Sequence, residues 1–264
     1  MQYLSRSIQL LWLLILINTR AALALRGAFL LRSFFMFLNN LLFFITWIIL
    51  FTKVDHIGGW HLQDCALLYG LVAFGIGIYA VCFGGVSNLS RMIAEGELDT
   101  FLSQPKSVLL SAVASKTNVA GWGDIVSGAL LIIWSGYASP ENIVLVFICS
   151  ISTMILYTMT GIIVHSFAFW LGSIDSLAMQ MHEFVIAFSL YPGVIFKGML
   201  RVMLFTIIPA GFISYLPVEL IRSFSWSEAG LLLLGVVTYT LLGLLIFSAG
   251  LRRYESGNKV IVRA

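Results

Sequence analysis

Long runs of apolar residues, separated by short charged segments, dominate the hydrophobic pattern of this chain. Five runs contain no Asp, Glu, Lys or Arg and approach or exceed the roughly 20 residues needed to cross a bilayer; they are 33–52, 65–90, 142–174, 202–218 and 229–251. A sixth, 125–140, reaches that length only if it extends back past Asp124 to about residue 117. We therefore predict six spans, near residues 31–52, 65–88, 118–138, 142–171, 199–217 and 229–250.

Each span is predicted to be a helix, because backbone N–H and C=O groups in lipid must be satisfied within the segment. A transmembrane barrel would show apolar and polar positions alternating over about 10 residues, and stretches such as 41–51 do not alternate. Glycines at 70, 75 and 77 permit close helix contacts, although ordinary membrane-helix composition explains them equally. The predicted fold class is an all-α polytopic membrane protein, with a single transmembrane domain over residues 1–264.

Two further segments have more than one interpretation. The N-terminal 1–28 contains an apolar stretch at 10–17 and Ala-Leu-Ala at 22–24, which imitate a signal peptide. Flanking arginines and an immediately following span favour an interfacial helix on the cytoplasmic face. Residues 172–198 are too long for a simple turn. We predict that they are cytoplasmic or interfacial, and the alternative is that 179–190 begins a long tilted fifth helix.

Composition agrees with this class and excludes most others. Hydrophobic residues make up 60% of the chain, charged residues only 10%, and the mean hydropathy is +0.99. Soluble domains carry about 25% charged residues, so this chain cannot cover a globule with hydrated surface. Disordered, coiled-coil and collagen-like classes are excluded on the same grounds. The three cysteines lie in apolar runs without Cys-x-x-Cys spacing, which argues against a disulfide framework or a zinc site.

The positions of the basic residues predict the orientation. With the N-terminus inside, thirteen of the fifteen Lys and Arg residues lie on the inner side, among them Lys197, Arg201, Lys259 and Arg263. Only Lys53 and Arg222 lie on the outer side. By the positive-inside rule both termini are then cytoplasmic, which an even number of spans allows.

The segment 90–105, between the second and third predicted spans, is unusually polar. Four apolar residues fall roughly on one helical face: Ile93, Leu98, Phe101 and Leu102. Gly96 interrupts this pattern and Pro105 ends it. An amphipathic helix on the cytoplasmic side can dock a soluble partner, and the alternative is a surface loop that merely links two spans.

The run Gly96-Glu97-Leu98-Asp99, followed by Leu102 and Gln104-Pro105, resembles the G-x-L-D-x-x-L-x-x-P signature of ABC-2-type transporter permeases. The whole chain is similar to a bacterial subgroup of ABC-2-like permeases usually encoded in pairs beside one ATPase. Other features agree in order and spacing: an N-terminal amphipathic helix, Gly123-Asp124, Tyr191-Pro192, Pro209 with Tyr215 and Pro217, and Arg253-Tyr254-Glu255-Ser256.

The resemblance implies the permease subunit of an ATP-driven ABC transporter in the bacterial cytoplasmic membrane. Its partners would be two copies of an ABC ATPase subunit, a second permease copy or a paired permease, and the lipid bilayer, with no nucleic acid. The resemblance makes 90–105 the coupling segment, with ATPase contacts from Ile93, Glu97, Leu98, Asp99 and Leu102. It also places a re-entrant outer segment at about 208–226, where Phe212 and Tyr215 are gate candidates. The alternative is an ordinary outer loop with interfacial aromatics.

Other chemistry has little support in the sequence. The Walker A loop, the G-x-S-x-G elbow and H-E-x-x-H are absent, so ATP and Mg are expected on the partner ATPase and no catalytic residue is predicted here. The four histidines are scattered in sequence, and His56 and His61 with Asp55 and Asp64 make at best a weak metal site. We therefore predict no metal and no cofactor bound by this chain.

Polar residues within the spans are the remaining pathway candidates. Asp124 lies near the inner end of the third span, where a carboxylate suggests function, although an interfacial anchor or an ion pair with Lys116 explains it equally. Asn39 and Asn40 lie midway along the first span. One of them is expected to hydrogen-bond a neighbouring helix, and the other could line a pathway.

We favour an exporter that works by alternating access, with an amphipathic or lipid-like cargo suggested by the apolar, aromatic spans. A secondary transporter driven by an ion gradient would show inverted repeats and ionisable residues near mid-span, and neither is evident. An integral-membrane enzyme would need polar catalytic groups at one depth. Asp124, Asp175 and His182 lie on the predicted inner side, but in no known catalytic spacing.

Overall fold

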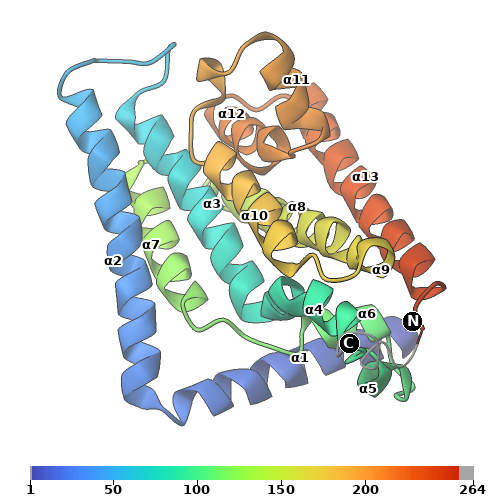
Figure 1. Cartoon of the computed structure of the whole chain (residues 1–264). Helices are drawn as coiled ribbons and strands as arrows, with labels where there is room; N and C mark the ends of the chain where they lie inside the picture. Colours follow the sequence, from blue (N-terminus) through green and yellow to red (C-terminus); the bar gives the residue numbers. More distant parts are fainter. Residues whose placement is uncertain (1, 256–264) are drawn as a thin grey trace.

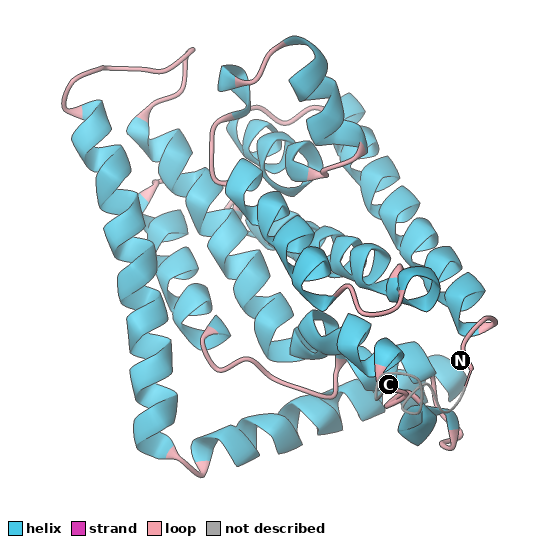
Figure 2. Ribbon diagram, viewed as in Figure 1, coloured by secondary structure: helices cyan, strands magenta, loops and turns pink. Residues whose placement is uncertain are grey.

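The computed structural model describes residues 2–255, and the elements in that range are helices and loops (Figure 2). Four helical segments are long and apolar enough to cross a membrane. They are α2 (Arg26–Phe51), α3 (Leu62–Phe83) continued through η1 (Gly84–Asn88) and α4 (Leu89–Ala94), α8 (Ile143–Ser166) with α9 (Ala168–Leu171), and α13 (Trp226–Leu251). α7 (Gly121–Trp134) is apolar but shorter. The all-helical class is confirmed, whereas the count of six spans is not.

α1 (Gln2–Leu23) lies across one end of the helix bundle and meets α2 at a sharp corner (Figure 1). The side chains of Trp12, Leu13 and Ile17 are exposed on it. On another side, Asn18 Nδ2 donates to the carbonyl of Ala114, 3.1 Å away, next to α6 (Val108–Val113). This is the geometry expected of an interfacial helix whose apolar face is free to enter a membrane surface.

α3 is the central helix, and its backbone touches that of α7. A Cβ atom added at Gly70 would lie 3.0 Å from the carbonyl oxygen of Gly128, and one added at Gly77 would lie 2.8 Å from that of Gly121. Side chains larger than hydrogen would therefore push the two helices apart. The close contacts expected from the glycines of this span are confirmed, and they seat α7 against α3.

The fifth span expected at 199–217 is not one continuous helix. The chain there forms α11 (Gly198–Thr206), the π-helix η3 (Gly211–Tyr215) and α12 (Leu216–Arg222), with a bend of 80° between α11 and the rest. Pro209 lies in the break, where its missing N–H and its ring prevent α11 from continuing. The expected re-entrant segment, 208–226, includes the second arm of this bend.

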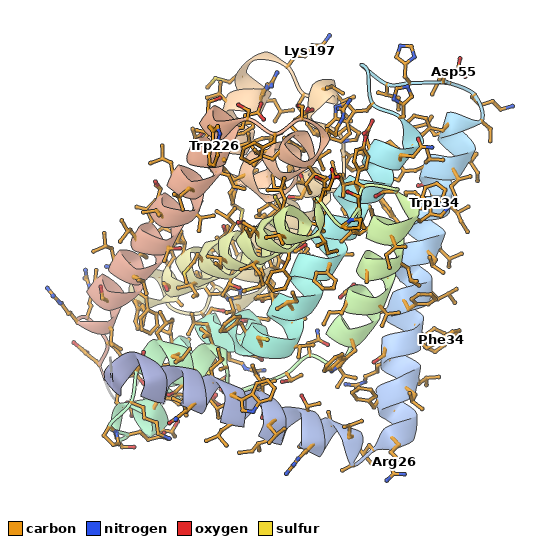
Figure 3. All side chains as sticks on the ribbon, turned by 180° about the vertical axis from the view of Figure 1, so that it is seen from behind. Arg26, Phe34, Asp55, Trp134, Lys197 and Trp226 are labelled. Carbon is orange, nitrogen blue, oxygen red and sulfur yellow. The ribbon has the colours of Figure 1, made fainter. Side chains whose placement is uncertain are left out.

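α10 (Asp175–Ser189) runs beside α8 in place of the expected loop (Figure 1). The alternative, that 179–190 begins a long tilted fifth helix, is also wrong: a helix covers these residues, but it begins at Asp175, ends at Ser189 and is separated from α11 by residues 190–197. As a result Lys197 lies at the same end of the molecule as Asp55, opposite Arg26 (Figure 3). Placing Lys197 and Arg201 on the side of Arg26 was wrong for this reason, and Lys259 and Arg263 lie outside the described residues.

Candidate functional site

The segment expected to couple to an ATPase forms a compact double turn at the end of α3. α4 ends at Ala94, the chain reverses, and α5 (Asp99–Leu102) follows. Gly96 sits at the reversal with φ +74°, a conformation that costs glycine little. The Glu97 N–H then donates to the carbonyl of Met92 at 2.9 Å, which closes the turn.

Burial divides the expected ATPase contacts into two groups. Ile93 and Leu98 are 3% and 0% exposed, so they pack inside this chain and hold the segment in place. Because both side chains are buried, they are not available for the direct contact with a partner that had been expected from the motif. Leu102 is 45% exposed, and Glu97 and Asp99 are half-buried. The segment also exposes residues that the motif did not suggest, among them Arg91, Glu95 and Thr100.

The end of the described chain packs against the same segment. The Tyr254 ring lies 6.1 Å from that of Phe169, and Phe169 in turn lies 5.6 Å from Phe247 of α13. Burial, followed by the neighbouring Asp99 carboxylate, raises the pKa of Tyr254 to about 12. α13, α9 and the coupling segment therefore share one contact region.

A single hydroxyl joins the coupling segment to α8 and α10. Ser90 Oγ donates to Asp175 Oδ1 at 2.7 Å and lies 2.9 Å from His165 Nδ1. Because serine has one hydroxyl proton and the carboxylate accepts it, His165 Nδ1 must be the donor in the second bond. All of these groups lie at the end of the bundle that carries α4.

His182 continues this polar region deeper into the bundle. Its ring lies 6.0 Å from that of His165 and stacks on Tyr157 at 4.0 Å, and its Nε2 donates to the Tyr157 carbonyl at 3.0 Å. Sequence analysis missed this arrangement, because His165 and His182 are 17 residues apart and share no motif. Polar residues at the ends of adjacent predicted helices were the available signal.

Asn40 and Asp124, predicted separately, meet in one buried network. Asn40 Nδ2 donates to Asp124 Oδ1 at 2.7 Å and to Ser127 Oγ at 2.8 Å, while Tyr69 donates its hydroxyl to Asn40 Oδ1 at 3.2 Å. The asparagine that bonds a neighbouring helix is therefore Asn40, and Asn39 is exposed. These contacts join α2, α3 and α7 around the Asp124 carboxylate.

The two gate candidates lie inside the chain. Phe212 is 8% exposed and packs against Gly235 of α13, and Tyr215 is 6% exposed and donates its hydroxyl to the Phe188 carbonyl at 2.7 Å. Thr153 of α8 donates to the Ile213 carbonyl at 2.6 Å, which satisfies backbone within the π-helix. The re-entrant segment is thus fixed to α8, α10 and α13, and neither aromatic side chain faces open space in this conformation.

A second buried carboxylate organises the opposite end. Asp64 is 1% exposed; it accepts hydrogen bonds from the Tyr137 hydroxyl at 2.7 Å and the His61 N–H at 2.8 Å, and Arg222 Nε lies 3.2 Å away. Burial, followed by the Asp64 carboxylate, raises the pKa of Tyr137 to about 12. Within residues 2–255 no three His, Cys, Asp or Glu side chains are grouped so as to hold a metal ion.

The sequence was also compared with known proteins. The model of a family described as ABC-2 family transporter protein matches residues 37–257, which is more than half of the chain. No curated protein and no solved structure matches it. The matched range contains the coupling segment, the Asn40 and Ser90 networks and the re-entrant segment.

Proposed function

This chain belongs to the ABC-2 family of transporter proteins, and we propose that it is the membrane-spanning permease of an ATP-driven exporter. Subunits of this family are multi-pass membrane proteins that transport and are generally not enzymes. In our proposal two copies of a separate ATPase bind ATP and Mg, and two permease subunits, identical or paired, form the pathway. The cargo would be amphipathic or lipid-like and would cross by alternating access.

The observation that carries this proposal is the way in which the coupling segment is packed and hydrogen-bonded to the rest of the chain. Ile93 and Leu98 anchor it in the core, while Leu102 remains exposed for a partner. Ser90 links the same segment to His165 of α8 and Asp175 of α10 through hydrogen bonds of 2.9 and 2.7 Å. A push on the segment would therefore be passed directly to two long helices, as a motor-driven permease requires.

The surface supports assembly in a membrane. In the most apolar stretch of α2 only 17% of the residues are buried within the chain, and in that of α13 only 28% are. Both helices therefore need lipid or a second subunit to cover them. α1, the start of α2 and the end of α13 lie at the end that carries the coupling segment (Figure 1). Four arginines belong to or directly follow these parts of the chain: Arg20, Arg26, Arg252 and Arg253. We propose that this end faces the cytoplasm of a bacterial cell, with the protein in its cytoplasmic membrane and both termini inside.

Co-purification tests the proposal directly. The tagged chain is extracted from native membranes in mild detergent, and bound proteins are identified by mass spectrometry. We expect a subunit with a Walker A loop, lost when the exposed Leu102 is changed to Asp and retained when Val54, at the opposite end, is changed to Asp. Recovery of the permease without any ATPase, repeated after cross-linking, would contradict the proposal and favour a gradient-driven carrier.

A further inference from the structure

One face of α10 has a composition unlike that of a lipid-facing helix. Its buried side, which packs toward α8, carries four residues: Ala178, His182, Val185 and Ser189. The opposite side is exposed and carries a polar stripe of Ser176, Gln180 and Glu183, followed by Ala187. These positions are separated by three or four residues, so they line up along one side of the helix.

The two ends of α10 are fixed, and Glu183 lies between them. At one end Asp175 accepts from Ser90, and at the other the Phe188 carbonyl accepts from Tyr215 of the re-entrant segment. At a rise of about 1.5 Å per residue, Glu183 is about 12 Å along the axis from Asp175. The carboxylate therefore lies at a depth between the coupling segment and the re-entrant segment.

A carboxylate at that depth needs water or a positive partner. Ionisable side chains within spans are costly against lipid and face a cavity or pair with an opposite charge. Among the described residues none of the ion pairs involves Glu183. The sequence has no Lys or Arg in 33–52, 54–90, 117–196, 202–221 or 223–251, so a second copy brings no Lys or Arg from its helices to this depth.

We propose that this stripe faces the transport pathway and that Glu183 binds a cationic group of the cargo, which makes the cargo an amphipathic cation. This inference rests on the proposed function and narrows its substrate class. Exposed apolar side chains flank the stripe and would hold the apolar body of such a molecule: Leu177, Met179, Met181 and Phe184. Flexible methionines fit varied apolar shapes, and the ring of Phe184 can also attract a cation.

Water access to the stripe is the first test. The background is a variant in which the three native cysteines, Cys65, Cys82 and Cys149, are replaced. Single cysteines are then introduced on the stripe by Glu183→Cys and Gln180→Cys. The control is Leu245→Cys, on the exposed side of α13. The probe is a membrane-impermeant, cationic methanethiosulfonate applied to membrane vesicles of both orientations. We expect labelling at 183 and 180 and none at 245. Absence of labelling at both α10 positions would overturn the proposal.

Charge selection is the second test. Tetraphenylphosphonium and tetraphenylborate have nearly the same shape and opposite charge, and their binding is measured on the purified permease in nanodiscs. We expect preference for the cation, and Glu183→Gln should weaken its binding by about tenfold or more while leaving the anion unaffected. Glu141→Gln, in the loop before α8, is the matched control and should bind both ions as the parent does.

The outcomes separate this inference from the proposed function. Equal cation affinity in the parent and a folded Glu183→Gln variant, or preference for the anion, would overturn the inference even if an ATPase co-purifies. Glu183-dependent cation binding in a permease that recovers no ATPase would support the inference and contradict the motor. A Glu183→Gln protein with an altered melting temperature is replaced by Glu183→Asp, which should retain cation preference.

Discussion

The carboxylate of Asp64 lies 3.2 Å from the guanidinium Nε of Arg222 and fastens the end of α12 to the start of α3. Asp64 is buried, and the Arg222 guanidinium also lies over the Trp60 ring, 5.6 Å from its centroid. The second arm of the re-entrant bend is therefore held at its far end by a charge pair. The stability of that end should depend on this contact.

Changing Arg222 to Met should destabilise the protein, because it leaves the buried Asp64 carboxylate without its cation. Breaking a buried pair costs up to 3–5 kcal/mol, and since Arg222 is partly exposed we expect about 2 kcal/mol. That corresponds to a loss of about 4–8 °C in melting temperature for a chain of this size. Thermal unfolding in detergent measures it. Adding Asp64→Asn should recover part of the loss, and no recovery would argue against the pair.

Tyr137 should ionise at unusually high pH. Its pKa is raised to about 12 by burial and by Asp64, above the ordinary value of 10. A group whose pKa is higher in the folded than in the unfolded state stabilises the fold fully below the unfolded value, so this contribution is lost as the pH rises from about 10 to 12. The tyrosinate absorbance of the parent minus that of Tyr137→Phe measures the titration. A midpoint near 10 would contradict the contact with Asp64.

Ser90→Ala should separate ATP hydrolysis from transport. The substitution removes the hydroxyl that joins His165 and Asp175 to the coupling segment, and the docking surface around Leu102 is untouched. We expect the ATPase partner to remain bound and active while transport per ATP hydrolysed falls about tenfold, as for the loss of roughly 1–3 kcal/mol of buried hydrogen bonding. Ser103→Ala, on the exposed side of the segment, is the matched control and should transport normally.

The neighbouring asparagines of α2 should differ sharply. Asn40→Leu deprives Asp124 and Ser127 of a hydrogen-bond donor in a buried network, and we expect it to lower the free energy of unfolding by about 1–2 kcal/mol. This is more than the average of about 0.6 kcal/mol for one hydrogen bond between membrane helices, because two buried acceptors lose their donor. Asn39→Leu changes an exposed position and should leave the melting temperature of the protein unchanged. Equal melting temperatures for the two variants would show that the network contributes little.

Hydropathy predicted the helical class and most of the long helices, but it could not predict a bend. Residues 202–218 read as one apolar run, although Pro209 and the π-helix divide it. α10 was only an alternative because Asp175, His182 and Glu183 lower its hydropathy. Two of those polar groups are bonded within the bundle, and the third, Glu183, lies on the exposed stripe that we propose faces the pathway.

The polar segment at 90–105 could be recognised from sequence, but the roles of its residues could not. A motif lists Leu98 and Leu102 alike, and only the packed chain shows that the first is an anchor and the second is exposed. The bonds between Ser90, His165 and Asp175 join residues far apart in sequence, and no local spacing encodes them. Asp64 and Arg222 were missed for the same reason.

The backbone contact between α3 and α7 offers a fixed reference for studying motion in this molecule. Helices that meet at Gly70 and Gly128 with their backbones in close contact form a tightly packed pair, and we expect them to move as one unit. Spin labels placed across this pair should keep one distance through every state of the protein. Distances from labels on α3 or α7 to labels on α10 or α11 would then report the movement of α10 or α11 relative to this fixed pair.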